Sequence, residues 1–354
     1  MDAKKSINFN LQQITKKQLL EIGQAHGLDV KQSMKKEEIV DEVGNVLEEH
    51  FKHDMDYFLI CDYLFYTSII VNYYADWYEN DMIEYLKEDP LSKSYKLKHK
   101  DGQMLFQRGY ILLITGRDKQ QHIILHKPLN DILLSNVDEA ALKAVNNEKV
   151  DFFMTALANL YGCYSLTQFL HIWNKYNQKE KMAEKKAVDF CKEMNKREVH
   201  YWFDGEYIVH RLISEFEVDE LLEQTANKPY YTPTMDEIEI YAHHLIDETT
   251  PAHKKLAAFF NTYKGGLNPK ATEEMIFRLA AAFKFNSGPS DLFKILNSMH
   301  YNFEGEKTLA EFNDMLNYSN NNIRKWVNRG ATPKELFEQF EKPFLKDLPK
   351  KPWK

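Results

Sequence analysis

The dipeptide Asp204-Gly205 constrains the fold of this chain more than any other local feature. It separates two short segments, 199–203 and 206–210, in which apolar side chains alternate with others. An Asp-Gly pair between alternating segments is the strongest short signal for a tight β-hairpin. We therefore expect two antiparallel strands here, with positive φ at both central residues of the turn.

Three helical segments precede this hairpin. The first, 152–161, stops at Gly162; Ser165 caps the second, and the third covers 182–194. Three helices followed by a hairpin is the order of elements in a winged helix. We therefore assign a winged-helix-like domain to residues 150–225.

Winged helices bind DNA with one helix in the major groove and the hairpin on the phosphate backbone. The segment 174–197 carries eight basic and four acidic residues. The candidate nucleic-acid contacts in it are Lys175, Lys179, Lys185 and Lys186. Charges of alternating sign are equally typical of a solvated, salt-bridged helix, and many winged helices bind only proteins. Both interpretations stay open at this point.

The first fifty residues predict a small helical module. Thr15 is an expected N-cap for a first helix that ends at Gly27, and 35–47 has the apolar spacing of a second helix. An extended turn around Leu28 and Val30 joins the two helices.

This pattern resembles the N-terminal helix-extension-helix module of transcription termination factor Rho and the related SAP motif. The residues that carry the resemblance are Lys16, Lys17, Leu19, Leu20, Ala25, Gly27, Leu28, Met34, Lys35, Lys36, Ile39 and Val40. In such modules, basic residues beside the extended turn meet phosphates. The resemblance thus implies nucleic-acid contacts at Lys16, Lys17, Lys31, Lys35 and Lys36. The alternative is that these lysines solvate a small domain that mediates protein contacts.

Residues 54–149 predict aromatic-rich helices followed by a second hairpin. The expected strands are 105–115 and 122–125, joined by the turn 116–119, and the chain then returns to helix. A degraded second winged helix is one interpretation of this region. The longest apolar run, 57–75, is interrupted by Asp62 and Asn72, so we expect a buried helix rather than a membrane span.

Beyond Pro229 and Pro233 the chain predicts a helical domain, 229–354. Its expected helices are 234–246, 251–263, 272–283, 289–299 and 309–327, followed by a short helix capped by Thr332 and a basic tail. This half resembles a helical region of uncharacterised bacterial and phage-borne proteins that often end in a SEC-C zinc knuckle. The residues that carry this resemblance are Trp326, Asn328, Gly330, Thr332, Pro333, Glu335, Leu336, Pro349, Lys350, Lys351, Pro352 and Trp353. The knuckle itself is missing from the sequence, so no metal site is implied.

The sequence contains no motif typical of a catalytic site and only weak candidate residue pairs. P-loop, GxGxxG, HExxH, GxSxG and paired CxxC motifs are absent. His243 and Asp247 are four residues apart, as two ligands on one helix face would be, but a third ligand would have to come from His253 or His300. A Cys163–His171 nucleophilic pair lacks a third, orienting group. We therefore expect no enzymatic activity, metal or cofactor.

Composition agrees with a globular protein: 44% of residues are hydrophobic and 28% are charged. Three scattered cysteines and no signal-peptide pattern predict a cytoplasmic protein without a membrane segment. We expect a mainly α fold with small β-hairpins. The favoured function is a non-enzymatic DNA- or RNA-binding protein, regulatory and of mobile-element origin. The alternative is a protein-interaction scaffold that docks a partner through the winged helix or the C-terminal helices.

Overall fold

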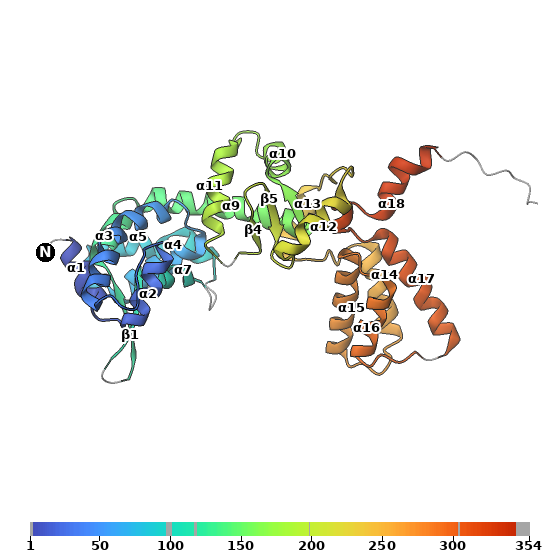
Figure 1. Cartoon of the computed structure of the whole chain (residues 1–354), viewed down its shortest axis with the longest axis horizontal. Helices are drawn as coiled ribbons and strands as arrows, with labels where there is room; N and C mark the ends of the chain where they lie inside the picture. The colour runs from blue at the N-terminus through green and yellow to red at the C-terminus, as the bar shows by residue number, and fades with distance from the viewer. Residues whose placement is uncertain (1–2, 97–100, 117–118, 198, 304, 345–354) are drawn as a thin grey trace, which may run out of the picture. The chain divides into compact units, whose positions relative to one another are not determined.

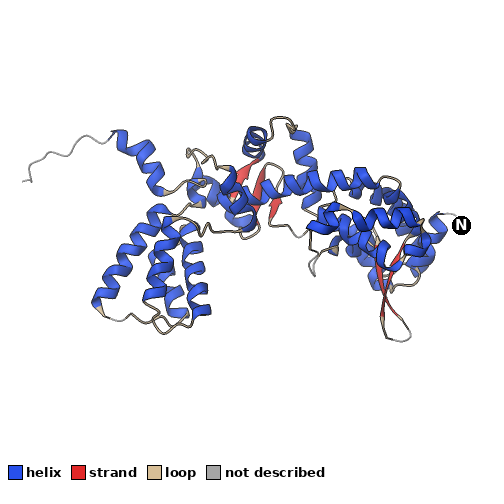
Figure 2. Cartoon of the chain, turned by 180° about the vertical axis from the view of Figure 1, so that it is seen from behind, coloured by secondary structure: helices blue, strands red, loops and turns tan. Residues whose placement is uncertain are grey.

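The computed structural model describes residues 3–96, 101–116, 119–197, 199–303 and 305–344. The chain divides into two compact units, Met1–Asp151 and Phe152–Lys354. The described residues are mainly helical, with one two-stranded and one three-stranded antiparallel sheet (Figures 1 and 2). The expected class, mainly α with small hairpins, is confirmed. None of the described helices combines the length and the apolar character that a membrane span requires.

The elements of the first unit follow one another along the chain. They are α1 (Ala3–Leu11), α2 (Lys16–Ala25), α3 (Lys36–Met55), α4 (Ile60–Tyr73), η1 (Ala75–Trp77), α5 (Asn80–Glu88), α6 (Pro90–Ser94), α7 (Gln103–Gln107), β1 (Ile111–Thr115), β2 (Gln121–Leu125), α8 (Lys127–Leu134) and the first half of α9 (Val137–Tyr161).

The N-terminal helices start as expected but share their core with the rest of the unit. Thr15 Oγ1 accepts a hydrogen bond from the Gln18 amide at 3.2 Å, and the Gln18 side chain closes a capping box. Helix α3 continues to Met55, through the expected boundary near residue 50, because Phe51 is fully buried against aromatic rings. One hydrophobic core extends from Ile7 to Ala144, so the segments 1–50 and 54–149 do not have separate cores.

The first hairpin is present but shorter than expected. Strand β1 pairs antiparallel with β2, and Ile111 lies opposite Leu125. The expected start of the strand at Leu105 is wrong, because this residue lies in α7 and Gly109 (φ +68°) turns the chain before the strand begins. Two residues of the expected turn, 117 and 118, lie outside the described residues. The described part of this unit has no third strand.

The second unit begins with a three-stranded sheet among helices. After α9 come β3 (Cys163–Ser165), α10 (Leu166–Tyr176), α11 (Glu184–Met194), β4 (Tyr201–Phe203), β5 (Tyr207–His210) and α12 (Glu215–Thr225). The strands lie in the order β3-β5-β4, all antiparallel. Ser165 caps α10 as expected, by accepting from the Gln168 amide at 3.2 Å.

The hairpin expected around Asp204-Gly205 is confirmed, but its turn differs. Gly205 has φ +116°, as expected, whereas Asp204 does not adopt positive φ, so the expectation is wrong for Asp204 alone. The Asp204 carboxylate instead accepts from the amides of Glu206 (2.7 Å) and Tyr207 (2.6 Å). This side-chain capping holds a three-residue loop between the strands.

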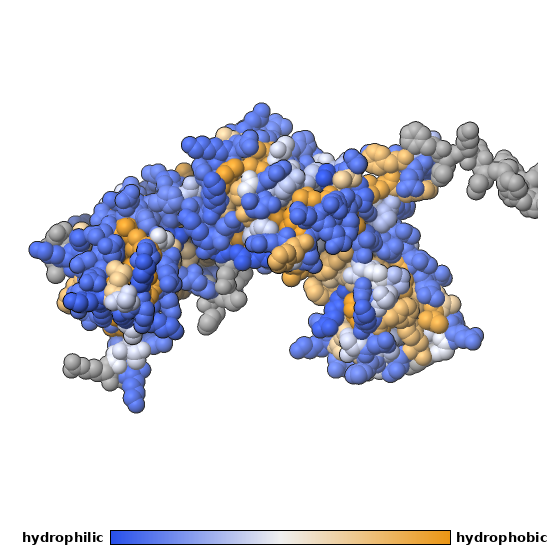
Figure 3. Space-filling model, viewed as in Figure 1, coloured by the Kyte–Doolittle hydropathy of each residue, from blue (hydrophilic) through white to orange (hydrophobic). Residues whose placement is uncertain are grey.

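Helices make up the remainder of the second unit. They are α13 (Met235–His243), α14 (Pro251–Thr262), α15 (Pro269–Lys284), α16 (Pro289–Ser298), α17 (Glu306–Asn322), η2 (Trp326–Asn328), α18 (Pro333–Leu336), η3 (Phe337–Glu341) and η4 (Lys342–Phe344). Helices α14 to α17 pack around a core that includes Leu256, Phe260 and Leu279, and apolar side chains also reach the surface of this bundle (Figure 3). The basic tail 345–354 lies outside the described residues.

Trp326 joins the C-terminal part of this unit to the sheet. Its indole N–H donates to the Asn159 carbonyl at 3.0 Å, and its ring packs against Phe285 and His210. Gly162 (φ +75°) lies directly beneath the ring, where a Cβ would come within 2.5 Å of it. Trp326 also belongs to the apolar cluster that contains Cys163 and Val209 of the sheet.

Candidate functional site

Four of the five candidate lysines in the N-terminal module already have partners within the protein. Lys16 Nζ donates to the Gln32 carbonyl at 2.6 Å, and Lys36 Nζ donates to the Gln12 carbonyl at 2.7 Å. Both lysines thus brace the loops that precede α2 and α3.

The other three candidate lysines of the N-terminal module are more exposed. Lys17 pairs with Glu21 (3.8 Å) and Lys31 pairs with Asp29 (2.9 Å). For Lys35 no hydrogen bond or ion pair of the side chain is found among the described residues. Exposed ion pairs of this kind are weak, so Lys17 and Lys31 stay available to a phosphate at low energetic cost.

The candidate lysines of the second unit are less engaged. Lys179, Lys185 and Lys186 are exposed, and no side-chain partner is found for them in the described part of the chain. Lys175 lies over the ring of Tyr176, 4.9 Å from its centre. Lys185 and Lys186 occupy the first turn of α11, which is the last of the three helices before the hairpin.

The hairpin tip has the opposite charge. Its loop carries Asp204 and Glu206, both exposed. A phosphate backbone would be repelled by this tip. The positive surface of the region therefore lies on α11 and the segment before it, and the hairpin tip does not extend it.

The expected geometry of the histidine–aspartate pair is wrong. Helix α13 ends at His243, so Asp247 lies in the following loop and not one turn further along the same helix. Its carboxylate accepts from the Thr249 amide (2.8 Å) and hydroxyl (2.7 Å), which stabilises the loop. Within either unit, the described residues bring no three His, Cys, Asp or Glu side chains to metal-binding distance of one another.

Two of the three cysteines lie in surroundings that disfavour a nucleophile. Cys163 and Cys191 are buried, and burial raises the pKa of each thiol to about 12. A reactive cysteine needs the opposite shift, toward the thiolate. His171 is exposed on α10, and no contact between it and the buried Cys163 is found among the described residues.

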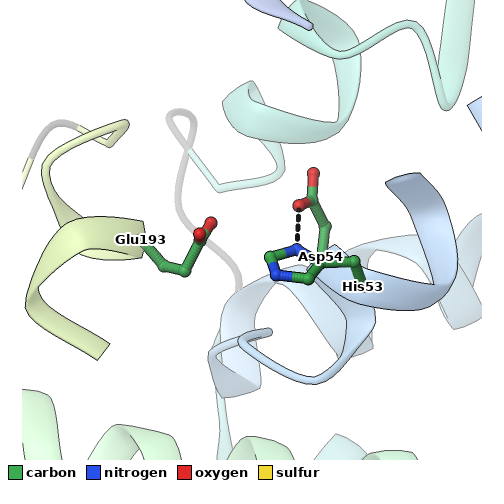
Figure 4. Close-up of side chains that lie close together, drawn as sticks. All are labelled: His53, Asp54 and Glu193. Carbon is green, nitrogen blue, oxygen red and sulfur yellow. Dashed lines mark hydrogen bonds and ion pairs between the residues drawn. The ribbon is translucent and has the colours of Figure 1, made fainter. Parts of the chain in front are cut away.

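Polar groups of the first unit form a network around the buried Asp54, and Arg108 connects it to the buried His26. Its carboxylate accepts from the Tyr110 hydroxyl (2.6 Å), and its other oxygen lies 3.2 Å from His53 Nδ1 (Figure 4). His26 Nδ1 lies 2.7 Å from His50 Nδ1. Burial lowers the pKa of His26 to about 4, so this ring is neutral at pH 7. The network satisfies buried polar groups and stabilises this core.

The second unit contains a cavity of about 300 Å³ that sequence analysis did not find. Side chains from α13, α14, α15, α17 and the segment after α17 line it. At one side of the cavity, Arg324 pairs with Glu237 (2.9 Å) and Glu335 (2.9 Å), and its guanidinium lies 3.5 Å from the centre of the Tyr231 ring. This cation is fully engaged by protein groups.

Lys284, the last residue of α15, also lines the cavity and is 1% exposed. Its Nζ lies 4.6 Å from the centre of the Tyr241 ring, and no hydrogen bond or ion pair is found for it among the described residues. Burial and, to a lesser degree, the charge of Arg324 lower the pKa of Lys284 to about 7, against a weaker opposing effect of Asp247.

The sequence did contain a signal for this residue. Lys284 follows Ile276 and Ala280 at intervals of four, which places it on the apolar face of α15. Arg324 and Glu237 gave no such signal, because they are 87 residues apart and meet only in the folded unit.

Comparison of the chain with family models, with curated proteins and with solved structures finds no match.

Proposed function

We propose that this chain is a nucleic-acid-binding protein in which residues 150–225 act as a winged helix. The order α9-β3-α10-α11-β4-β5 together with the strand order β3-β5-β4 supports this proposal. In a winged helix, the helix before the hairpin enters the major groove. Here that helix is α11, whose C-cap residue Asn195 exchanges hydrogen bonds with the backbone of Phe203 in β4.

The single observation that carries the proposal is that three lysines on and before α11 are exposed and without partners among the described residues. Lys179, Lys185 and Lys186 are exposed, and no intramolecular partner is found for them in the described residues. A phosphate can therefore bind these lysines without first displacing a carboxylate. The acidic hairpin tip implies that the recognition helix, rather than the wing, approaches the nucleic acid.

The N-terminal module is a secondary contact in this proposal. Its resemblance to the Rho and SAP modules supports phosphate binding beside the extended turn. However, Lys16 and Lys36 would lose hydrogen bonds to backbone carbonyls if they turned to a phosphate. We therefore assign the larger share of the binding energy to the second unit.

A protein-interaction role is the second candidate, and one observation favours it. Phe216, at the start of α12, is 95% exposed, and Leu212 just before it is 62% exposed. Aromatic side chains such as that of Phe216 are enriched in protein interfaces. Acidic residues surround them, among them Glu215, Glu217 and Asp219.

Salt-dependent binding tests the proposal. The variant replaces Lys175, Lys179, Lys185 and Lys186 by Gln. The matched control replaces Lys254, Lys270, Lys294 and Lys307, four exposed lysines of the helical bundle, and so changes the net charge equally. Binding to duplex and single-stranded probes is measured by fluorescence anisotropy at several salt concentrations.

Each phosphate contact contributes a slope of about −0.9 in log K against log salt for duplex DNA and about −0.7 for single strands. The variant should flatten the slope by roughly two to four units, whereas the control should leave it nearly unchanged. Equal effects of both sets would show that only net charge matters. Absence of salt-sensitive binding by the intact chain to every probe would refute the proposal in favour of the protein-interaction role.

A further inference from the structure

A buried amine that lacks a counter-ion needs an explanation. Lys284 is 1% exposed, lines the cavity of the second unit, and its Nζ lies 4.6 Å from the centre of the Tyr241 ring. Lys325 offers the contrast: it is also buried, yet its Nζ donates to Asn286 (2.9 Å) and Asn320 (2.8 Å). The protein therefore satisfies one buried lysine with hydrogen bonds and leaves the other, in the wall of a cavity, without one among the described residues.

The charges of the residues that line the cavity limit which class of ligand it can bind. Its lining includes four carboxylates but only two cations besides Lys284; the carboxylates are Glu237, Asp247, Glu335 and Glu338, and the cations are Arg324 and Lys334. The lining is net negative even when Lys284 is protonated, so an anionic ligand is disfavoured. Among compounds that react with an amine, an uncharged one is therefore favoured over an anionic one.

The protonation state of Lys284 suits a ligand that reacts with a neutral amine. Because the pKa of Lys284 is lowered to about 7, mainly by burial, roughly half of the amine is neutral at pH 7. An ordinary lysine at this pH has on the order of a thousandfold less neutral amine. Desolvated lysines of this kind are the ones that form imines with carbonyl compounds.

We propose that the cavity of the second unit binds a small, uncharged aldehyde or ketone, which Lys284 holds as a reversible imine. The nitrogen lone pair attacks the carbonyl carbon, and the C=O π electrons move to oxygen, which takes up a proton as nitrogen releases one. The resulting carbinolamine loses water as the C=N bond forms. One amine and one carbonyl give one imine and one water, with no change of oxidation state. This inference is independent of nucleic-acid binding.

The experiment uses the intact protein with D,L-glyceraldehyde as the probe and sodium cyanoborohydride to trap imines at pH 7. Peptide mapping by mass spectrometry measures the initial labelling rate of each lysine. We expect Lys284 to be labelled at least about tenfold faster than the exposed Lys270 of the same helix, because its neutral fraction is larger. Lys325, which is buried but hydrogen-bonded and outside the cavity lining, should stay unlabelled on this time scale.

The dependence on probe concentration separates a binding site from a reactive amine. Binding in the cavity before imine formation predicts that the labelling rate of Lys284 saturates as glyceraldehyde is raised. A strictly linear rate would overturn the proposal of a site. Labelling of Lys284 no faster than Lys270, or equal labelling of Lys325 and Lys284, would overturn it as well, the last because both lysines would then be reached through local unfolding.

Discussion

Replacing Lys284 by Met should change how the stability of the second unit depends on pH. The folded pKa of Lys284 is about 7, against an ordinary 10.5, because burial and Arg324 disfavour its charge. The charged groups that act on it are Arg324, which lowers its pKa, and Asp247, which raises it, and the Tyr241 ring lies beside its Nζ. Between these two pKa values the unfolded chain binds a proton at this site that the folded chain does not.

The sign follows from this difference in bound protons. Stability rises with pH wherever the unfolded state binds more protons, by about 1.4 kcal/mol per pH unit for one proton. The wild type should therefore gain about 2 kcal/mol from Lys284 between pH 7 and pH 9 and little between pH 5 and pH 6.5. Methionine has no charge and fits a similar volume, so the variant lacks this gain. It should be more stable than the wild type at pH 7, and its advantage should shrink by about 2 kcal/mol at pH 9.

Urea unfolding followed by tryptophan fluorescence measures both proteins at each pH, with Trp326 as a reporter close to the site through its contact with Phe285. Subtracting one curve from the other cancels titrations that the two proteins share. The control is Lys270→Met, an exposed position on the same helix, for which the difference from wild type should stay constant with pH. A constant difference for Lys284→Met over pH 7 to 9 would refute the argument that this amine is buried without a counter-ion.

Three further predictions concern the hairpin, metal and the N-terminal lysines. Gly205→Val should destabilise the second unit by on the order of 1 kcal/mol in urea unfolding, because Gly205 has φ +116°; an unchanged midpoint would contradict this conformation. Since no three-ligand cluster forms within either unit's described residues, a chelator should leave the melting temperature unchanged; stoichiometric zinc in elemental analysis, lost together with stability, would show otherwise. Replacing Lys16, Lys17, Lys35 and Lys36 by Gln should flatten the salt slope of binding by roughly one to two units, less than the second-unit variant does, because two of these lysines already bond to carbonyls; a larger loss than that of the second-unit variant would reverse the ranking of the two contacts.

Local signals predicted most of the secondary structure. The caps Thr15, Ser165 and Thr332 mark helix starts as expected, because a side-chain oxygen within three residues decides each of them. Strand β3 was not predicted, because three residues are too few to show an alternating pattern. Residues Cys163–Ser165 form a strand only by pairing with β5. Helix α3 ran longer than expected because tertiary contacts of Phe51 determine where it ends.

The candidate site was only partly accessible to sequence analysis. Counting charges located the lysines around α11, but the partners of Lys16 and Lys36 are backbone carbonyls, which no residue pattern displays. Likewise, the cavity around Lys284 depends on how α13, α14, α15 and α17 meet. The expected helix 272–283 stopped one residue before Lys284, although helical periodicity puts this residue on the apolar face; only the packed helices show that the amine lacks a partner there.

The position of Trp326 has a consequence for the order in which a nascent chain folds. The carbonyl that accepts its indole N–H belongs to Asn159, 167 residues earlier, and Tyr231 likewise donates its amide to the Arg329 carbonyl. On the ribosome, the sheet β3-β5-β4 is synthesised long before the tryptophan that closes its apolar cluster. At 5–20 residues per second, the interval between residues 210 and 326 lasts on the order of ten seconds, during which Cys163 and Val209 lack this cover. The apolar cluster of the second unit therefore cannot close until late in synthesis.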